Sequence, residues 1–356
     1  GELGVALHGS VANNYVLDSN SREYLNFDGE TLRFALDLRY GLAQDWDLQL
    51  EIPWLEQSGG HLDRMIDDWH DLWGMSDGGR SRVPRNLLDY QYSSSFARGF
   101  QLEDDSSGLG DITLALNYAF FRDADSVVAL ALGYKFGVGD EDKFLGSGAD
   151  DQFIALRFSG SHLSGAPLRW HGQIGYLRAG DSDLLDGIQE QNLWFAGLSL
   201  DWMVARNWSL LAQVDSNAAP TDSGLTALGD TAVTLSGGAR WRFAPRWSVD
   251  ASIVEDIGVE TASDVTFQLS FRHSGACLAA VSGYPVARRL GQRRRRPVLR
   301  SRRCVEPAGE LRRRARPAPQ RRRAPLHCDA QQLGGVARAS QAPAVHARPP
   351  RLEALR

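Results

Sequence analysis

The chain has 356 residues, enough for one or two domains, but charge divides it into two unlike parts. Residues 1–274 carry 19 basic and 40 acidic side chains, a net charge of −21, together with all ten Trp and all fourteen Phe. Residues 275–356 carry 20 Arg and 4 acidic side chains, a net charge of +16, together with all three Cys. No stretch approaches the ~20 consecutive apolar residues that a membrane-spanning helix requires.

Residues 275–356 lack the apolar periodicity that a folded core requires, which predicts a disordered Arg/Pro-rich tail. A nucleic-acid arm or a membrane-surface patch would have a similar charge. Arg, Ala, Pro, Gly and Cys without a single Lys are, however, typical of a GC-rich gene that is read out of frame or past its stop codon. We therefore interpret the tail as frameshift or readthrough sequence and expect no nucleic-acid partner.

The N-terminal segment GELGVALHGS already has the pattern of a strand, and it contains neither an initiating Met nor a signal peptide. Either export signals have been removed, or the chain is a fragment that begins inside the mature protein. We expect an exported protein that is truncated at its N-terminus. The absence of Cys from residues 1–274 suits an exported bacterial protein without disulfides.

Residues 1–274 consist mainly of segments in which apolar and polar residues alternate, the period of β-strands. The pattern predicts about twelve strands, at residues 3–11, 32–40, 46–52, 112–120, 128–136, 154–158, 168–176, 194–202, 208–214, 233–243, 247–253 and 265–271. Short connections alternate with long ones at roughly 16–29, 54–109, 138–150, 178–190, 216–230 and 256–263. This plan predicts an all-β fold, an antiparallel transmembrane β-barrel of the outer-membrane type. A soluble sandwich with a Trp-rich core does not explain the alternating loop lengths.

Aromatic residues gather at the strand ends beside the short turns, where membrane barrels place a girdle of rings at the lipid interface. The predicted interface aromatics are Tyr40, Trp46, Phe120, Trp170, Trp202, Trp208, Phe243 and Trp247. In the hairpin RWRFAPRWSVDASI, residues 240–253, the Trp and Phe rings are then expected to face lipid while the charged residues between them face an aqueous interior.

The residues that alternate with the apolar set carry charges of both signs, and we expect them to line the lumen. The lumen-lining candidates are Arg33, Asp37, Arg39, Asp47, Glu51, Lys135, Arg157, Arg169, His171, Asp201, Asp215, Arg240, Arg242 and Asp250. Such a set suits a narrow wet channel, or ion pairs that close the barrel. Twelve strands enclose a modest interior, so both alternatives stay open.

Residues 59–74, GGHLDRMIDDWHDLWG, change to the period of an amphipathic helix, which we expect in the longest extracellular loop, over the barrel mouth or in its lumen. Its polar face carries Asp67, His70 and Asp71, whose spacing would permit a metal site. A solvated acidic face is the more usual meaning of this pattern. No motif for a phosphate, nucleotide or other cofactor is present.

Six motifs together resemble the bacterial domain of unknown function 3187 family over roughly residues 10–274. They are NNYVLDSNSREYLNFDGETLRFALDLRYGL, LEIPW, SGGHLDRMIDDWHDLWG, GGR at 78–80, SSGLGDITLALNY and GVGDEDKFLGSGADD. The resemblance implies an exported protein of the outer-membrane barrel type and implies no activity. Members usually have a further segment before the NNY strand and an aromatic-rich end, which this chain replaces with the Arg-rich tail.

Three classes of function fit this pattern. The first is a narrow pore or carrier for a small solute in the bacterial outer membrane. The second is a closed structural or surface barrel whose acidic loops meet lipopolysaccharide. The third is a membrane-embedded lipid hydrolase, but among the histidines only His171 is expected mid-strand on the inward set, and no nucleophile-elbow motif is present. The expected partners are outer-membrane lipids, lipopolysaccharide and the barrel-assembly machinery, and no cofactor is expected.

We predict that a chain ending at residue 274 refolds in detergent at least as well as the full chain, because the tail contributes no core. The fraction that shows heat-modifiable migration in gel electrophoresis measures the refolding yield. Failure of the truncated form alone would show that the tail belongs to the folded protein.

Overall fold

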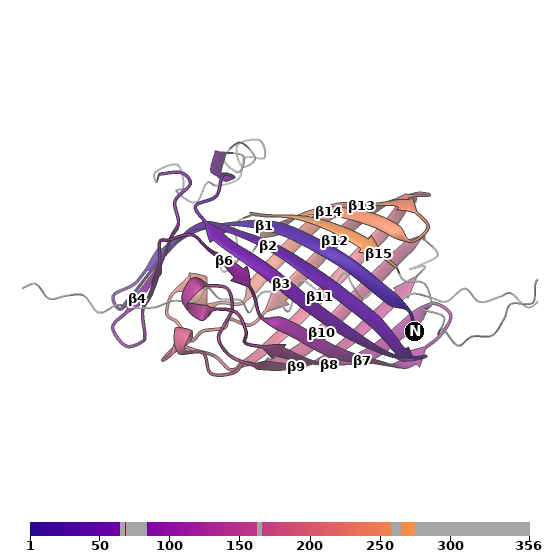
Figure 1. Cartoon of the computed structure of the whole chain (residues 1–356), viewed down its shortest axis with the longest axis horizontal. Helices are drawn as coiled ribbons and strands as arrows, with labels where there is room; N and C mark the ends of the chain where they lie inside the picture. The colour runs from indigo at the N-terminus through magenta and orange to yellow at the C-terminus, as the bar shows by residue number, and fades with distance from the viewer. Residues whose placement is uncertain (65–67, 69–83, 162–165, 258–264, 275–356) are drawn as a thin grey trace, which may run out of the picture. The chain divides into compact units, whose positions relative to one another are not determined.

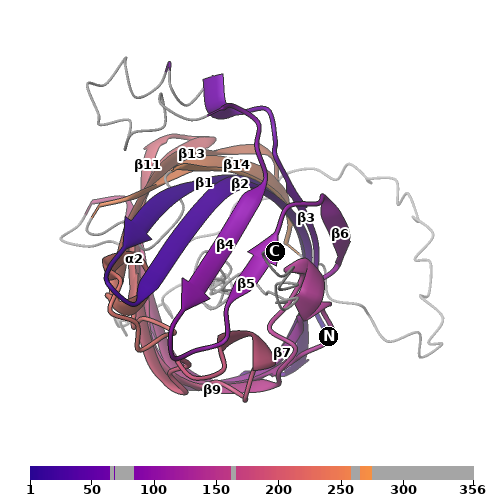
Figure 2. The same cartoon turned by 90° about the vertical axis from the view of Figure 1, so that its left-hand side faces the viewer.

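The structure is a computed structural model that describes residues 1–64, 68, 84–161, 166–257 and 265–274. Within these ranges fifteen strands form one antiparallel sheet, and twelve of them close into a ring (Figures 1 and 2). The ring strands are β1 (Leu3–Ser19), β2 (Glu23–Ala43), β3 (Trp46–Ser58), β7 (Ile112–Arg122), β8 (Ser126–Phe136), β9 (Asp151–Ser161), β10 (Leu168–Arg178), β11 (Asn192–Ala205), β12 (Trp208–Asn217), β13 (Ala232–Ala244), β14 (Trp247–Asp256) and β15 (Val265–His273).

Pairing of the first strand with the last closes the barrel. β1 and β15 are antiparallel, with a register that runs from Val5 opposite His273 to Asn13 opposite Val265. Each remaining neighbour in the ring also follows in chain order, so the ring leaves no open edge. The predicted fold class, strand number and strand positions are confirmed, because an alternating pattern under lipid specifies which face of each strand points outward.

The prediction of a long loop at residues 16–29 is wrong. β1 continues to Ser19 and β2 begins at Glu23, so only residues 20–22 turn. Val16 and Leu25 are buried here, which explains why the two strands continue past the rim of the ring. The segment DSNSRE has the polar composition of a loop, and this composition concealed the strands.

The segment expected to be one long loop, residues 54–109, contains three further strands. They are β4 (Asp89–Ser94), β5 (Phe100–Leu102) and β6 (Ser106–Leu109). β4 pairs with the extended part of β2, β5 pairs with β4, and β6 pairs with the end of β3. Strands of three to six residues are too short for a period of two to stand out in the sequence.

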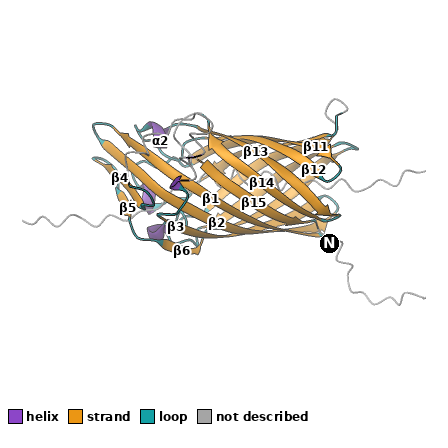
Figure 3. Cartoon of the chain, turned by 90° about the horizontal axis from the view of Figure 1, so that it is seen from above, coloured by secondary structure: helices purple, strands orange, loops and turns teal. Residues whose placement is uncertain are grey.

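The helix expected at residues 59–74 lies mostly outside the described residues, and so do the weak metal candidates Asp67, His70 and Asp71. The loops also carry short helical turns, η2 (Glu141–Lys143), η4 (Asp183–Leu185) and α2 (Thr226–Gly229), at the same rim as β4 (Figure 3). In the described part of the chain, no helix has both the length and the apolar character to cross a membrane.

Exposed aromatic rings lie at two levels of the outer face, which we call the first and second aromatic belts. Of the aromatics predicted beside the short turns, seven are well exposed, and Trp170 is half-buried against Phe158. The second belt, which the sequence reasoning missed, contains Trp54, Phe136, Tyr176 and Trp194. In β3 and in β11 the belts are eight residues apart, which is roughly 20 Å along the axis of a barrel with tilted strands.

Asp111 joins the barrel wall to the loop at 138–150. It lies between β6 and β7, and its buried carboxylate accepts hydrogen bonds from the backbone N–H groups of Gly139 and Ser147, both at 2.9 Å. Lys135 Nζ lies 3.1 Å from Asp111 and 2.6 Å from Asp151, which gives the buried ammonium two carboxylate partners. This junction fixes the loop against the inner wall.

We predict that Asp111→Ala lowers the free energy of unfolding by about 3 kcal/mol, because two buried N–H groups lose their acceptor and Lys135 loses a carboxylate. Denaturant unfolding of the refolded protein in detergent, followed by Trp fluorescence, measures the change. Asp104→Ala is the matched control, since Asp104 is exposed. Equal stability of the two variants would contradict this role for Asp111.

Candidate functional site: the barrel interior and its mouth

Asp201 on β11 is the centre of a group of arginines on the inner face. It is fully buried, and its Oδ2 lies 2.7 Å from Arg169 Nη2, 2.8 Å from Arg240 Nη1 and 3.5 Å from Arg242 Nη2. These arginines stand on β10 and β13, so the contacts connect three strands that are not all adjacent. Three cations share one carboxylate at this point.

Asp250 on β14 extends this group toward β15. Arg240 binds it through two hydrogen bonds, from Nε at 2.7 Å and from Nη2 at 2.8 Å. Arg272 Nε lies 2.9 Å from the second carboxylate oxygen. A bidentate guanidinium contact of this kind has a fixed geometry, so it holds β13 and β14 in register from inside the barrel.

A second group occupies the opposite side of the ring. Arg39 forms two hydrogen bonds with Asp47, both at 2.7 Å, and Asn117 donates to the same carboxylate at 2.9 Å. Arg157 on β9 donates to Asn117 Oδ1 at 2.8 Å and to Gln49 Oε1 on β3 at 3.2 Å. Because β7 and β8 separate β3 from β9, these bonds pass through the interior.

The remaining lumen-lining candidates lie on the same inner face. Arg33 contacts Glu51, and Gln49 donates to Asp37 at 2.6 Å. Asp215 accepts a hydrogen bond from Gln213 at 2.6 Å, and His171 is buried opposite Ser199 in the neighbouring strand. The structure therefore brings the predicted set together as ion pairs and hydrogen bonds on the inside of the wall.

Some buried polar atoms of the interior have no protein partner. Among the described residues they include Arg157 Nε, the Nε and Nη1 atoms of Arg33, Asp37 Oδ1, Ser199 Oγ and Asp201 Oδ1. Buried polar groups in proteins are hydrogen-bonded, and groups that lack a protein partner bind ordered water instead. The interior at this level is therefore suited to water or to a polar solute.

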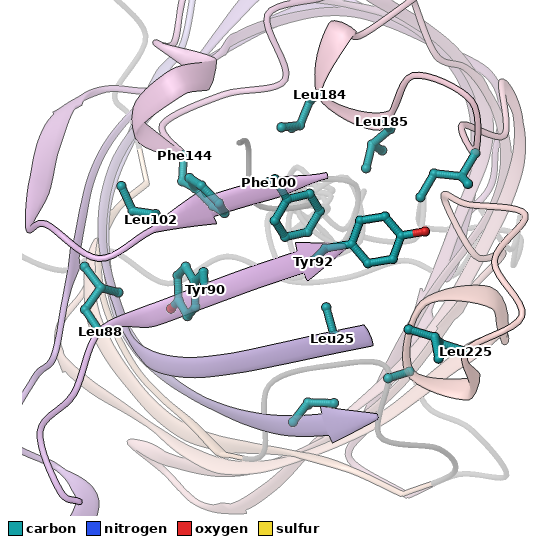
Figure 4. Close-up of a cluster of buried hydrophobic side chains, with 13 residues drawn as sticks. Leu25, Leu88, Tyr90, Tyr92, Phe100, Leu102, Phe144, Leu184, Leu185 and Leu225 are labelled. Atoms are coloured by element: carbon teal, nitrogen blue, oxygen red, sulfur yellow. The ribbon is translucent and has the colours of Figure 1, made fainter. Parts of the chain in front are cut away.

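The mouth at the long-loop rim is filled by apolar side chains that we call the mouth cluster (Figure 4). Its buried members are Val16, Leu25, Leu88, Tyr90, Tyr92, Phe100, Leu102, Phe144, Leu184, Leu185, Ile188, Leu225 and Ala227. They come from β1, β2, β4, β5 and four loops. Their rings lie close together, with the centroids of Tyr92 and Phe100 5.1 Å apart. The cluster separates the polar interior from the long-loop side.

The hairpin β4–β5 crosses the mouth from one wall to the other (Figure 2). β4 pairs with β2 over its whole length, from Asp89 to Ser94. At the hairpin tip, Arg98 donates from its backbone N to Asp186 O at 3.1 Å and from Nη1 to Asp183 O at 3.0 Å. Both carbonyl groups belong to the loop between β10 and β11. In the ring of twelve, β11 is six strands from β2, so the hairpin connects opposite walls.

Glu23 lies beyond the second aromatic belt, opposite Ser94 at the tip end of β4, and fastens this end of the hairpin. Its carboxylate accepts hydrogen bonds from Ser223 Oγ at 2.6 Å, Tyr92 Oη at 2.8 Å, Asn20 Nδ2 at 3.0 Å and Gly224 N at 3.0 Å. Burial raises the pKa of Glu23, but these four hydrogen bonds outweigh it, and the net pKa is lowered. Burial and the bond to Glu23 raise the pKa of Tyr92 to about 12, so its phenol remains a donor.

The expectation that His171 is the one histidine mid-strand on the inward set is wrong. His8 is also buried on the inner face of β1, and its Nδ1 lies 2.7 Å from Ser270 Oγ on β15. The alternating pattern contains this information, since His8 lies between the outward Leu7 and Gly9. The mouth cluster had no comparable signal, because its members are scattered over eight segments of the chain.

The closed ring, the two aromatic belts and the charged inner face define a β-barrel of the outer-membrane type. The chain belongs to the family described as Protein of unknown function (DUF3187), whose model matches residues 2–274. No curated protein matches the sequence significantly.

Solved structures of outer-membrane proteins resemble the chain in fold. An outer membrane channel from Pseudomonas putida F1 is 12% identical, with a TM-score of 0.50 over 77% of this chain and 95% of that one. The NanC porin is 9% identical, with a TM-score of 0.40 over 76% and 99%. The translocator domain of the autotransporter NalP from Neisseria meningitidis is 10% identical, with a TM-score of 0.40 over 77% and 88%. At 12% identity, the similarity to the channel from Pseudomonas putida F1 shows the fold alone.

We predict that acid loosens the hairpin. The stabilisation from Glu23 is complete above its ordinary pKa of 4.5 and is lost as the pH falls through the lower pKa of the folded state. Glu23→Gln should exchange amide hydrogens in residues 89–102 about tenfold faster at pH 7, because charge-assisted hydrogen bonds are lost. Hydrogen exchange with mass spectrometry measures this, with the exposed Glu190→Gln as control. An unchanged rate of exchange in residues 89–102 would show that Glu23 does not hold the hairpin in place.

Proposed function

We propose that this protein is an outer-membrane barrel of a bacterium and acts as a narrow gated pore or carrier for a small solute. One observation carries the proposal. The inner face holds buried hydrogen-bonding atoms without protein partners below a mouth closed by loops and a hairpin. A barrel built only for rigidity has no use for unpaired buried donors and acceptors, since each is costly when dry.

The mouth closure has the properties of a gate. Its members belong to β4, β5 and the loops, except for a few residues at the extended ends of β1 and β2. At the tip, Arg98 supplies the hydrogen bonds to the opposite wall. Displacing the hairpin breaks the pairing of β4 with the extension of β2 but no pairing between two ring strands, so it requires less free energy than opening the barrel.

A closed structural barrel is the second candidate. The observation that favours it is the network of ion pairs around Asp201 and Asp250, which connects the walls from inside. In this alternative the long loops meet lipopolysaccharide and the belts of rings only anchor the barrel in lipid. Conductance separates the two candidates, because a closed barrel passes no current with its hairpin free or fixed.

The position of the candidate catalytic bases, His8 and His171, disfavours a lipid hydrolase. His8 and His171 are both buried on the inner face, while the lipid surrounds the outer face. A base for lipid hydrolysis must reach the substrate within hydrogen-bond distance. Neither histidine has this access.

We predict that fixing the hairpin to the opposite wall abolishes conductance. A Cβ built on Gly187 would lie 3.3 Å from Ala97 Cβ, close to the ~3.8 Å of a disulfide. Ala97→Cys with Gly187→Cys should therefore cross-link the tip, in a chain whose Cys277, Cys304 and Cys328 are replaced by Ser. Gly187 has a φ of +89°, so the new side chain costs about 1 kcal/mol.

Single-channel recording in planar bilayers measures the effect, with the reduced double variant and Ala97→Cys alone as controls. Current steps that disappear on oxidation and return on reduction support a pore gated at the mouth. Steps that persist in the cross-linked protein would show that the solute bypasses the mouth cluster. Silence of the reduced protein, in a folded heat-modifiable state, would favour the closed barrel.

A further inference from the structure

We infer that the solute is a small anion of the carboxylate class and that Arg157, together with the neighbouring arginines of the interior, binds it. This inference rests on the proposed pore and deepens it by naming the class of solute. The arginine ring is defined as Arg39, Arg157, Arg169, Arg240, Arg242 and Arg272. These residues stand on five of the ring strands, on the inner face.

The arginine ring exceeds its carboxylates in number. The acidic residues on the same part of the inner face are Asp47, Asp201 and Asp250, which contact the ring directly, and Asp37 and Glu51, which lie opposite each other on β2 and β3. Arg33, which contacts Glu51, adds a seventh cation. Asp37 and Arg272 belong together because both pair with Ala6, one from each side. Seven cations and five anions leave an excess of two positive charges. In a narrow interior walled by protein and lipid, such an excess attracts anions and repels cations.

Among the described residues, no carboxylate forms an ion pair with Arg157. Its Nη1 donates to the amide oxygens of Asn117 and Gln49, which are neutral acceptors, and its Nε is buried without a partner. The side chain is half-buried, and its Nε is a donor to which the protein supplies no acceptor. A carboxylate oxygen is the acceptor that guanidinium N–H groups bind best.

Arg169 and Arg242 extend this surface toward the short-turn rim. Both share Asp201 with Arg240, yet their side chains keep 29% and 26% of their surface exposed. Arg240 itself is 4% exposed, so it holds the wall together while the outer two remain accessible from the lumen. A solute anion that passes Arg157 therefore meets a second group of cations on its way through the barrel.

Ion selectivity tests the inference in the protein without the engineered disulfide. Reversal potentials in a KCl gradient should show a chloride-to-potassium permeability ratio above one. Arg157→Gln should lower this ratio roughly fivefold, because loss of one nearby charge disfavours the anion and favours the cation. Arg242→Gln should act in the same direction and leaves Asp201 paired with two arginines. Arg178→Gln, on the long-loop rim, removes an equal charge outside the arginine ring.

A binding measurement tests the same residues without any current. In ¹⁹F saturation-transfer NMR, trifluoroacetate should receive signal from the refolded protein and lose it in Arg157→Gln, while Arg178→Gln binds as the original does. Arg157→Lys keeps the charge and should retain part of the binding. Each variant must first show heat-modifiable migration, so that loss of binding is not loss of fold.

The outcomes separate this inference from the proposed pore. A conducting protein that prefers potassium, or one whose ratio does not change in Arg157→Gln, overturns the anion assignment and leaves the pore. A silent protein that binds trifluoroacetate through Arg157 overturns the pore and leaves the anion site. Absence of trifluoroacetate binding in a folded protein overturns the anion site directly.

Discussion

A strand surrounded by lipid must pair its backbone N–H and C=O groups with other strands, because no water is available to bond them. In this protein the pairing of β1 with β15 meets that requirement, since it removes the two edges that an open sheet would leave. Every other property of the molecule follows from the closed ring. Side chains then alternate between lipid and interior, which places the rings of Trp46 and Trp202 outside and Asp47 and Asp201 inside.

Closure also forces charged residues into one confined space. Asp201 is fully buried and would be expensive to ionise alone, but three arginines from β10 and β13 surround it. Such a group holds the wall in register and leaves the interior polar. Because more arginines than carboxylates point inward in this part of the wall, the same arrangement that stabilises the barrel also gives the interior its charge.

The end of the barrel beyond the second aromatic belt is stabilised differently from the part inside the membrane. Water reaches this part, so strands may end and loops may fold, and apolar side chains gather away from solvent as in a soluble protein. The mouth cluster is this small core, and the hairpin β4–β5 carries Tyr92 and Phe100 into it. A soluble core over a charged membrane interior yields an apolar closure above a hydrophilic passage, the arrangement on which the proposed gate depends.

The sequence by itself determined the class of fold, the positions of the ring strands and the side of the wall on which each charged residue lies. A period of two is a local property, and lipid outside with water inside makes it strict. It did not reveal β4, β5 and β6 or the strand ends at Ser19 and Glu23, because short pairings there depend on distant partners. Only the tertiary structure joined Arg157 to Gln49 and Arg98 to Asp186, since closing the ring brings together strands that are far apart in the chain.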